Sequence, residues 1–372
     1  AGALARPDAG NGTVTMPDGG THTWSTDGAP YNFFAGTDYS TGIRVGMQYV
    51  KDAGATKVAF AYCSAGYCTE PIPAGKSYAD SVGLTVGPDF RFYCTCGLDA
   101  DDKCTNPNDS NSYQVLSKWF EANPSKSWAT MTDEEKKPVS GIELGDAEPV
   151  ITAKVTAYFS QVDAANHPEW VWIGNTTKTT AFIIKAMASI ATAQNAKAII
   201  NVWGFDENLH GRCPDACKER AFGTMPFRAF GDTTATGMQA VLDVHTEYRT
   251  LLKDSTDEKV RCRNITDQPE GECKDVRYIQ GYTSFHLWKH AIEKLADAGE
   301  DLAAPDIGTK VKAELEKLTN FDLGGLTAAP LSFSATDHRP QGAEAIYKVG
   351  TDGKLKFEKS VTVTLDAAWL GW

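Results

Sequence analysis

Apolar and polar positions along the chain follow two recurring patterns. Short runs that are apolar at almost every position, such as KVAFAY at 57–62 and WVWIG at 170–174, predict strands that are covered on both faces. The longer segments between them carry apolar residues three or four positions apart, which predicts amphipathic helices. We predict helices at 41–54, 74–83, 151–166 and 179–194, and strands at 57–62, 83–94, 170–174, 197–204 and 221–230.

Strands that alternate with helices of this length predict βαβ units, in which parallel strands form a sheet with helices on both faces. The pattern changes after 230. Helices are then predicted at 236–254, 278–299 and 309–318, followed by β-segments at 329–335, 343–350 and 354–365. An Asp352-Gly353 pair predicts a hairpin turn between the last two segments. The expected fold class is α/β, interrupted by a polar, acidic insertion at 94–148.

Composition narrows the possible partners. The chain has 372 residues, enough for two lobes with separate cores, and a formal net charge of -12. This acidity, with no basic run, argues against nucleic acid and anionic membranes, because affinity for nucleic acid depends first on neutralising phosphate. No apolar stretch approaches the roughly 18–20 residues that span a bilayer, and the first residues lack the regions of a signal peptide, so we expect any export signal to be removed already.

Cysteines indicate the compartment. Nine of them lie mostly in polar loops, which favours disulfides in an oxidising environment. The local spacing predicts bridges between Cys262 and Cys273 and between Cys213 and Cys217. Pairing of Cys63 with Cys68, and among the cysteines at 94, 96 and 104, stays open, and the odd count leaves one thiol over. Zinc is disfavoured because these spacings do not form paired C-x2-C knuckles.

Chemistry-bearing residues follow the predicted strands. In an open parallel sheet, ligands meet the carboxyl ends of the strands, where the loops converge. These loops offer aromatic faces, hydroxyls, an amide and a carboxylate, which together suit a small ligand held by stacking and a few hydrogen bonds. The candidate ligand-binding residues are Tyr67 after 57–62, Asn175, Thr176 and Thr177 after 170–174, and Trp203 and Asp206 after 197–204.

Each candidate also has a purely structural interpretation. Tyr67 and Trp203 could pack in the core, and Thr176 and Thr177 could cap the helix that follows them. Catalytic motifs are missing from the sequence: there is no G-x-S-x-G, H-E-x-x-H, P-loop or G-x-G-x-x-G after a strand. We therefore expect a binding protein without cofactor, metal or enzymatic activity.

The order of these motifs resembles a known family. The segments PYNFFAGTDYSTGIRVGMQYVKDAGATKVAFAYCSAGY, WVWIGNTTKTTAFIIKAM, AIINVWGFDENL and GLTAAPLSFSATDHRPQGAEAIYKVGTDGKLKF are similar to type I periplasmic solute-binding proteins of the branched-chain amino-acid, amide and urea ABC-transporter class. The resemblance runs from about 30 to the C-terminus, apart from 94–148 and the 262–273 loop. It implies two α/β lobes that trap a small molecule by hinge closure and deliver it to an ABC permease in the periplasm.

The resemblance also implies domain boundaries. Residues 1–35 would form the end of the first segment of the first lobe, and 36–231 would form the second lobe. The chain would return to the first lobe at 232–332, and 333–372 would be the tail of the second lobe. The tyrosine after the first second-lobe strand corresponds to Tyr67, and Tyr278 or Tyr282 from the other lobe would close over the ligand. Family members that bind amino acids carry another aromatic residue after the second such strand, where this chain has Thr176 or Thr177. After the third strand they carry a carboxylate for the ligand's ammonium, where this chain has Trp203 or Gly204.

These departures put an ordinary α-amino-acid ligand in doubt unless Asp206 or Glu207 supplies the charge. An amide, a urea-like molecule, or a small aromatic or carboxylate ligand fits instead. Most of the βα run that begins family members is missing, so the resemblance implies an incomplete first lobe, completed by a second polypeptide or lost by cleavage or truncation. The alternative function is a sensory or structural subunit of an envelope complex with the same fold.

Overall fold

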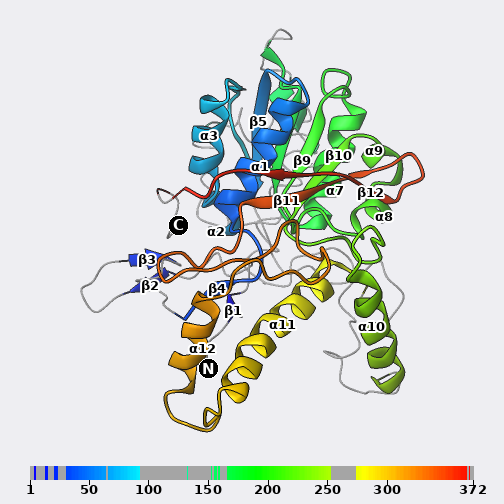
Figure 1. Cartoon of the computed structure of the whole chain (residues 1–372). Helices are drawn as coiled ribbons and strands as arrows, with labels where there is room; N and C mark the ends of the chain where they lie inside the picture. The colour runs from blue at the N-terminus through cyan, green and yellow to red at the C-terminus, as the bar shows by residue number, and fades with distance from the viewer. Residues whose placement is uncertain are drawn as a thin grey trace.

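The computed structural model contains an eight-stranded sheet with helices on both faces (Figure 1). The structure describes residues 4–5, 13–15, 21–23, 31–63, 66–92, 132, 152, 155–156, 158–159, 166–252, 274–366 and 368. The strand order is β12-β11-β10-β9-β8-β5-β6, and β7 also pairs with β5. The strands of this sheet are β5 (Lys57–Cys63), β6 (Thr85–Val86), β7 (Phe90–Phe92), β8 (Trp170–Gly174), β9 (Lys197–Ile200), β10 (Ala221–Met225), β11 (Ala343–Val349) and β12 (Leu355–Thr362).

Apolar side chains on both faces of the sheet explain its layered arrangement. Phe60 and Trp172 point to one face, where they pack with Ile43 of the first helix. Ile173 points to the other face and belongs to the same buried cluster as Ile184. The continuous apolar runs of β5 and β8 are thus confirmed as strands covered on both sides. The covering helices are α1 (Tyr39–Asp52), α2 (Gly66–Thr69), α3 (Ile72–Ser81), α7 (Thr177–Ser189), α8 (Leu209–Arg212) and α9 (Pro214–Cys217). We call this sheet with its helices the sheet unit.

A second group of elements lies below the sheet in the view of Figure 1. It contains α10 (Met238–Leu252), α11 (Val276–Asp297), α12 (Ile307–Glu316) and the parallel pair of β1 (Leu4–Ala5) with β4 (Phe33–Phe34). The short antiparallel pair of β2 (Thr13–Thr15) and β3 (Thr21–Thr23) lies near β4 in the same view. We call α10, α11, α12 and β4 the helical unit. Leu287 and Val311 of this unit share one buried apolar cluster with Ile173 of the sheet, so the two units have a continuous core.

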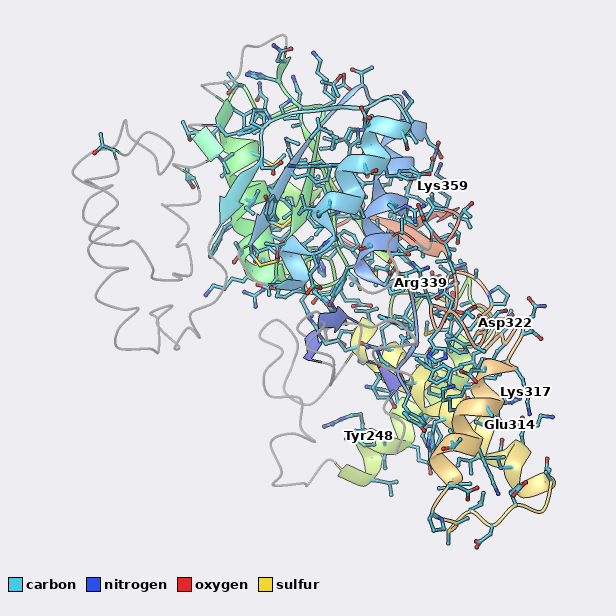
Figure 2. The ribbon with its side chains drawn as sticks, turned by 90° about the vertical axis from the view of Figure 1, so that its left-hand side faces the viewer. Tyr248, Glu314, Lys317, Asp322, Arg339 and Lys359 are labelled. Carbon is cyan, nitrogen blue, oxygen red and sulfur yellow. A yellow bond between two sulfur atoms is a disulfide. The ribbon has the colours of Figure 1, made fainter. Side chains whose placement is uncertain are left out.

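The chain passes between the units three times, from β4 to α1, from β10 to α10 and from α12 to β11. The first and third passages contact each other, because the backbone N–H of Phe34 donates to the carbonyl of His338 and the ring of Phe33 packs edge-on against Phe333. Arg339 is buried between the units and lies 3.7 Å from the carboxylate of Asp38 (Figure 2). The passages therefore form one connected region at the junction.

The strands from β5 to β10 are parallel, as the alternation of strands and helices predicts, and the hairpin predicted at Asp352-Gly353 is confirmed because β11 pairs antiparallel with β12. β11 also pairs antiparallel with β10, which makes the sheet mixed. One predicted feature differs from the structure. The predicted β-segment at 329–335 forms only a single bridge, between Leu331 and Phe321. Pro330 lies beside that bridge and has no backbone N–H, which limits a longer ladder at this point.

The helix predictions are confirmed with shifts of a few residues at most ends. The helix predicted at 179–194 begins at Thr177 and ends at Ser189, since Ile190 is already extended. The helix predicted at 278–299 begins two residues earlier because the carboxylate of Asp275 accepts the N–H of Arg277 and so caps the helix. The insertion at 94–148 and most of the helix predicted at 151–166 lie outside the described residues.

Two disulfides are present among the described residues. Cys63 is bonded to Cys68, and Cys213 to Cys217. The second bridge confirms the sequence prediction, and the first resolves a pairing that the sequence left open. The first bridge joins the end of β5 to α2, so it fixes the turn that carries Tyr67. The other five cysteines lie outside the described residues.

Candidate functional site

The candidate site lies at the carboxyl ends of three neighbouring parallel strands. β8 pairs with β5 on one side and with β9 on the other, and all three run in the same direction. The segments after Cys63, Gly174 and Ile200 therefore emerge at one edge of the sheet. Figure 1 shows this edge facing the helical unit, with one end of α11 directly beneath the sheet unit. Such an edge is the usual place for ligands in open α/β sheets.

The loops after β8 and β9 are joined through Thr177. Its hydroxyl lies 3.2 Å from the carbonyl oxygen of Trp203 and 3.0 Å from a carboxylate oxygen of Asp206. Asn175 is fully buried, and its side-chain oxygen accepts the N–H of Thr176 at 2.8 Å. Thr176 is the N-cap of α7, but its hydroxyl makes no capping bond. The structure thus brings together five of the predicted site residues, from Asn175 to Asp206.

Trp203 is held from two sides. Its indole N–H donates to the hydroxyl of Tyr39, in the first turn of α1, at 2.6 Å. The loop behind it packs closely because the next residue is Gly204. A Cβ at this glycine would lie 2.7 Å from the hydroxyl of Thr180 and 2.8 Å from the carbonyl of Asn175. The missing side chain therefore lets the loop after β9 press against the start of α7 and fixes the position of the indole.

Asp206 forms an ion pair with the helical unit. Its side chain is 2% exposed, and one carboxylate oxygen lies 3.2 Å from Nη1 of Arg277 on α11. The same nitrogen lies 3.1 Å from Asp275, which caps α11. Burial alone would lower the pKa of Arg277, but the charges of Asp206 and Asp275 raise the pKa overall. Arg277 therefore stays charged and bridges the two units.

Glu207 attaches the backbone of the helical unit to the same loop. One carboxylate oxygen accepts the N–H of Phe230 at 2.6 Å, and the other accepts the N–H of Val276 at 2.9 Å. Phe230 belongs to the passage between β10 and α10, and Val276 is the first residue of α11. Burial raises the pKa of Glu207 to about 8, although the hydrogen bond from Phe230 lowers it. The side chain therefore joins three segments.

The three predicted tyrosines lie farther from this cluster. Tyr67 is in α2, half-buried against the core between α1 and the sheet. Tyr278 follows Arg277 on α11, and its ring packs edge-on against Phe230 at 5.9 Å between ring centres. Tyr282, one turn further, lies against His286 at 4.3 Å. Tyr278 is thus adjacent to the cluster through Phe230, whereas Tyr282 contacts His286 on the same helix.

Sequence reasoning missed three residues of the site. Two of them lie at a signal that was readable, an aspartate before a helix, which marks an N-cap: Asp38 precedes Tyr39, and Asp275 is itself the N-cap of α11. Arg277 lies 71 residues from Asp206, and no local pattern connects the two. Among the residues that the structure describes, no group of three or more His, Cys, Asp or Glu side chains could hold a metal ion. The described helices also include none that is long and apolar enough to cross a membrane.

Comparison with solved structures identifies the fold. A substrate-binding protein of an ABC transporter from Aeropyrum pernix matches with a TM-score of 0.61 and 22% identity, over 94% of this chain and 71% of its own. A branched-chain amino-acid ABC transporter protein from Thermus thermophilus, solved with valine, matches with a TM-score of 0.57 and 14% identity, over 93% and 72%. A solute-binding protein from R. palustris, solved with benzoate, gives 0.54 and 14%, over 91% and 68%.

These neighbours are binding proteins of ABC transporters, and each extends beyond the part that this chain matches. Neither a scan against models of protein families nor a search of curated proteins finds a match. Identities at this level establish the fold. The chain has the two-unit α/β fold of the type I periplasmic solute-binding proteins.

Proposed function

We propose that this chain is the solute-binding component of an ABC importer and binds a small molecule at the carboxyl ends of β5, β8 and β9. One observation carries the proposal: the loop after β9 contacts the start of α11 directly, through the Asp206–Arg277 ion pair and the Glu207–Val276 hydrogen bond. A ligand held by Trp203 on one side and by Arg277 or Tyr278 on the other would touch both units. Its contacts would then favour one relative position of the units.

The mechanism we propose is a shift between open and closed positions. A ligand moves such an equilibrium only by the difference in its free energy of binding to the two states. Hinge motion would occur in the three passages between the units, near the predicted domain boundaries at 35, 231 and 332. The contacts of Asp206 and Glu207 with α11 are the bonds that would form on closing and break on opening.

The ligand-contacting residues we propose are Tyr67, Asn175, Thr176, Thr177, Trp203, Tyr278 and Tyr282, with Asp206 acting through Arg277. The neighbours solved with valine and with benzoate indicate how widely ligands vary within this fold. An amide, a urea-like molecule, an amino acid or an aromatic acid all remain within the proposed range. The described site contains stacking surfaces and hydroxyls, which such small, partly planar molecules would use.

The partners follow from the neighbours. Solute-binding proteins of ABC transporters pass their ligand to a permease, and we propose the same for this chain, in the periplasm. Two disulfides among the described residues are consistent with an oxidising compartment. The comparisons do not support a second polypeptide that completes the first lobe, and we propose none.

Native mass spectrometry of the gently purified chain tests this function. We expect a co-purified small molecule that is released on denaturation, and titration of the stripped chain with that molecule should give a saturable heat. Trp203→Ala should weaken binding, while Trp288→Ala, at an exposed site on α11, should not. A chain that carries no small molecule and shows no compaction by small-angle X-ray scattering with any tested solute would instead favour the sensory or structural role.

A further inference from the structure

We infer that Arg277 determines ligand class: the site accepts a planar molecule that presents a hydrogen-bond acceptor, a carboxylate or a carbonyl, and rejects one that presents an ammonium group. This inference rests on the proposed function, because it concerns the same site. It depends on two observations about the charged side chains that meet at the start of α11. The two aspartates are buried and already paired within the chain, whereas the arginine is partly exposed and has donors without a partner.

Every carboxylate oxygen of the acidic side chains at the site has a donor within the chain. Asp206 and Asp275 are 2% and 3% exposed at the side chain, so both depend on these internal donors. Asp206 accepts hydrogen bonds from the N–H of Asn208 and from the side chains of Thr177 and Arg277. Asp275 accepts from the backbone N–H and the side chain of Arg277. Glu207 accepts from the backbone N–H groups of Phe230 and Val276. A carboxylate oxygen can accept a second hydrogen bond, but the side chains of Asp206 and Asp275 are buried behind Arg277, so a ligand ammonium would have to displace Arg277 to reach them.

Displacement is costly because the displaced donors are partly buried. A donor left without a partner costs about 1–3 kcal/mol, and more if it is charged. Displacing Arg277 would also separate two buried carboxylates from the cation that compensates them. An ammonium therefore gains little, since its new ion pair replaces one that already exists.

Arg277 still has donors to offer. Only Nη1 is engaged by Asp206 and Asp275, and Nε and Nη2 have no partner among the described residues. The side chain is 45% exposed, and its central carbon lies 5.6 Å from the centre of the Trp203 ring. A guanidinium edge with two parallel N–H groups matches a carboxylate in a forked geometry, and one N–H suffices for a carbonyl. The neighbouring indole provides a flat surface for a planar ligand.

The charges at the site do not favour a ligand carboxylate over a ligand carbonyl as clearly as the geometry disfavours an ammonium. Asp206, Asp275 and Arg277 together carry a formal charge of about -1, which opposes an anion. The amino end of α11 carries partial positive charge and offsets part of this repulsion. The fork favours a carboxylate and the net charge favours a neutral carbonyl, so the experiment compares both with an ammonium on the same ring.

Isothermal titration calorimetry with benzoate, benzamide and benzylamine tests the inference, because the three probes differ in the head group. We expect benzoate or benzamide to bind and benzylamine to bind at least about tenfold more weakly, which corresponds to about 1.4 kcal/mol. Benzylamine that binds as tightly as the better of the other two would overturn the inference. A chain that binds none of the three at millimolar concentration would overturn it as well, while the co-purified molecule sought by mass spectrometry still decides the proposed function.

Two variants separate ligand contact from structural support. Arg277→Lys keeps a positive charge beside Asp206 and Asp275 but lacks the second pair of donors. We expect it to melt near the wild-type temperature and to lose at least about tenfold in affinity for the preferred probe. Lys289→Arg, on an exposed turn of the same helix, should change neither. Wild-type affinity in Arg277→Lys would show that the arginine only joins the units.

Discussion

The half-buried side chain of Glu207 should make the stability of the protein fall as the pH rises. Its pKa is raised to about 8 from a reference of 4.5, chiefly by burial. An acid with a raised pKa in the folded state holds its proton more tightly there than in the unfolded chain. Between about pH 4.5 and pH 8 the folded side chain is therefore protonated while the unfolded one is ionised. Stability from this group is full below that window and is lost as the pH rises through it.

The magnitude follows from the width of the window. The free energy of unfolding falls by at most about 1.4 kcal/mol per pH unit for one proton, so the fall across the whole window is at most on the order of 5 kcal/mol. Glu207→Gln removes the titration and keeps the shape of the side chain, but its amide NH2 group can only donate, so one of the backbone N–H groups of Phe230 and Val276 loses its acceptor. Near pH 5 the free energy of unfolding of the variant should therefore be about 1–3 kcal/mol below that of the wild type. Relative to the wild type, it should rise progressively up to about pH 8 and then level off.

Urea unfolding followed by tryptophan fluorescence, at constant ionic strength from pH 5 to pH 9, measures this difference directly. Glu344→Gln is an internal comparison, because burial raises the pKa of Glu344 to about 7 and its effect should level off near that pH. A free energy of unfolding of Glu207→Gln that, relative to the wild type, is constant with pH or falls as the pH rises would refute the reasoning. It would show that water reaches the Glu207 carboxyl in the folded protein.

Four further variants test local packing, a disulfide and the site. Gly204→Ala should destabilise the protein by about 1–3 kcal/mol, because the added Cβ would lie 2.7 Å from the hydroxyl of Thr180. Gly281→Ala should stabilise the protein by about 0.5–1 kcal/mol, because this glycine lies within α11 and an added Cβ would meet no other atom. Thermal melts compare the two variants. Replacing both Cys63 and Cys68 with alanine should lower the free energy of unfolding by about 2 kcal/mol in urea titrations, and an unchanged midpoint would contradict this. Trp203→Ala should weaken binding of the co-purified solute by tenfold or more in calorimetry with little change in melting temperature, since the indole is only partly buried.

The strands of the sheet could be predicted from the sequence because a strand buried on both faces is apolar at nearly every position. β5 and β8 are buried along almost their whole length, so their runs are apolar without interruption. No comparable sequence pattern indicates the direction of β11 relative to β10. Its residues would suit a parallel or an antiparallel neighbour, and pairing with β10 is decided only when the chain returns from α12 to the sheet. Local patterns specify that a strand exists, while its partner depends on the path of the chain.

The same distinction applies to the site. Its place at the strand ends followed from the general behaviour of parallel sheets, and Asn175, Thr176, Thr177, Trp203 and Asp206 do meet there. The ion pair could not be predicted, because Arg277 comes from another unit and is 71 residues away. Asp206 looked available for a ligand ammonium only because its partner was invisible in the sequence.

Asp206 and Glu207 are adjacent, yet they act on the helical unit in different ways. Asp206 holds a side chain, the guanidinium of Arg277, whereas Glu207 holds backbone, at the start of α11 and at Phe230. A ligand that engages Arg277 would therefore act on the same helix end that Glu207 holds to the sheet unit. Loss of the Glu207 contacts should change ligand affinity through the position of α11, although Glu207 need not touch the ligand. Loss of Trp203 should change affinity without moving the helix, and this difference separates a contact residue from a positioning one.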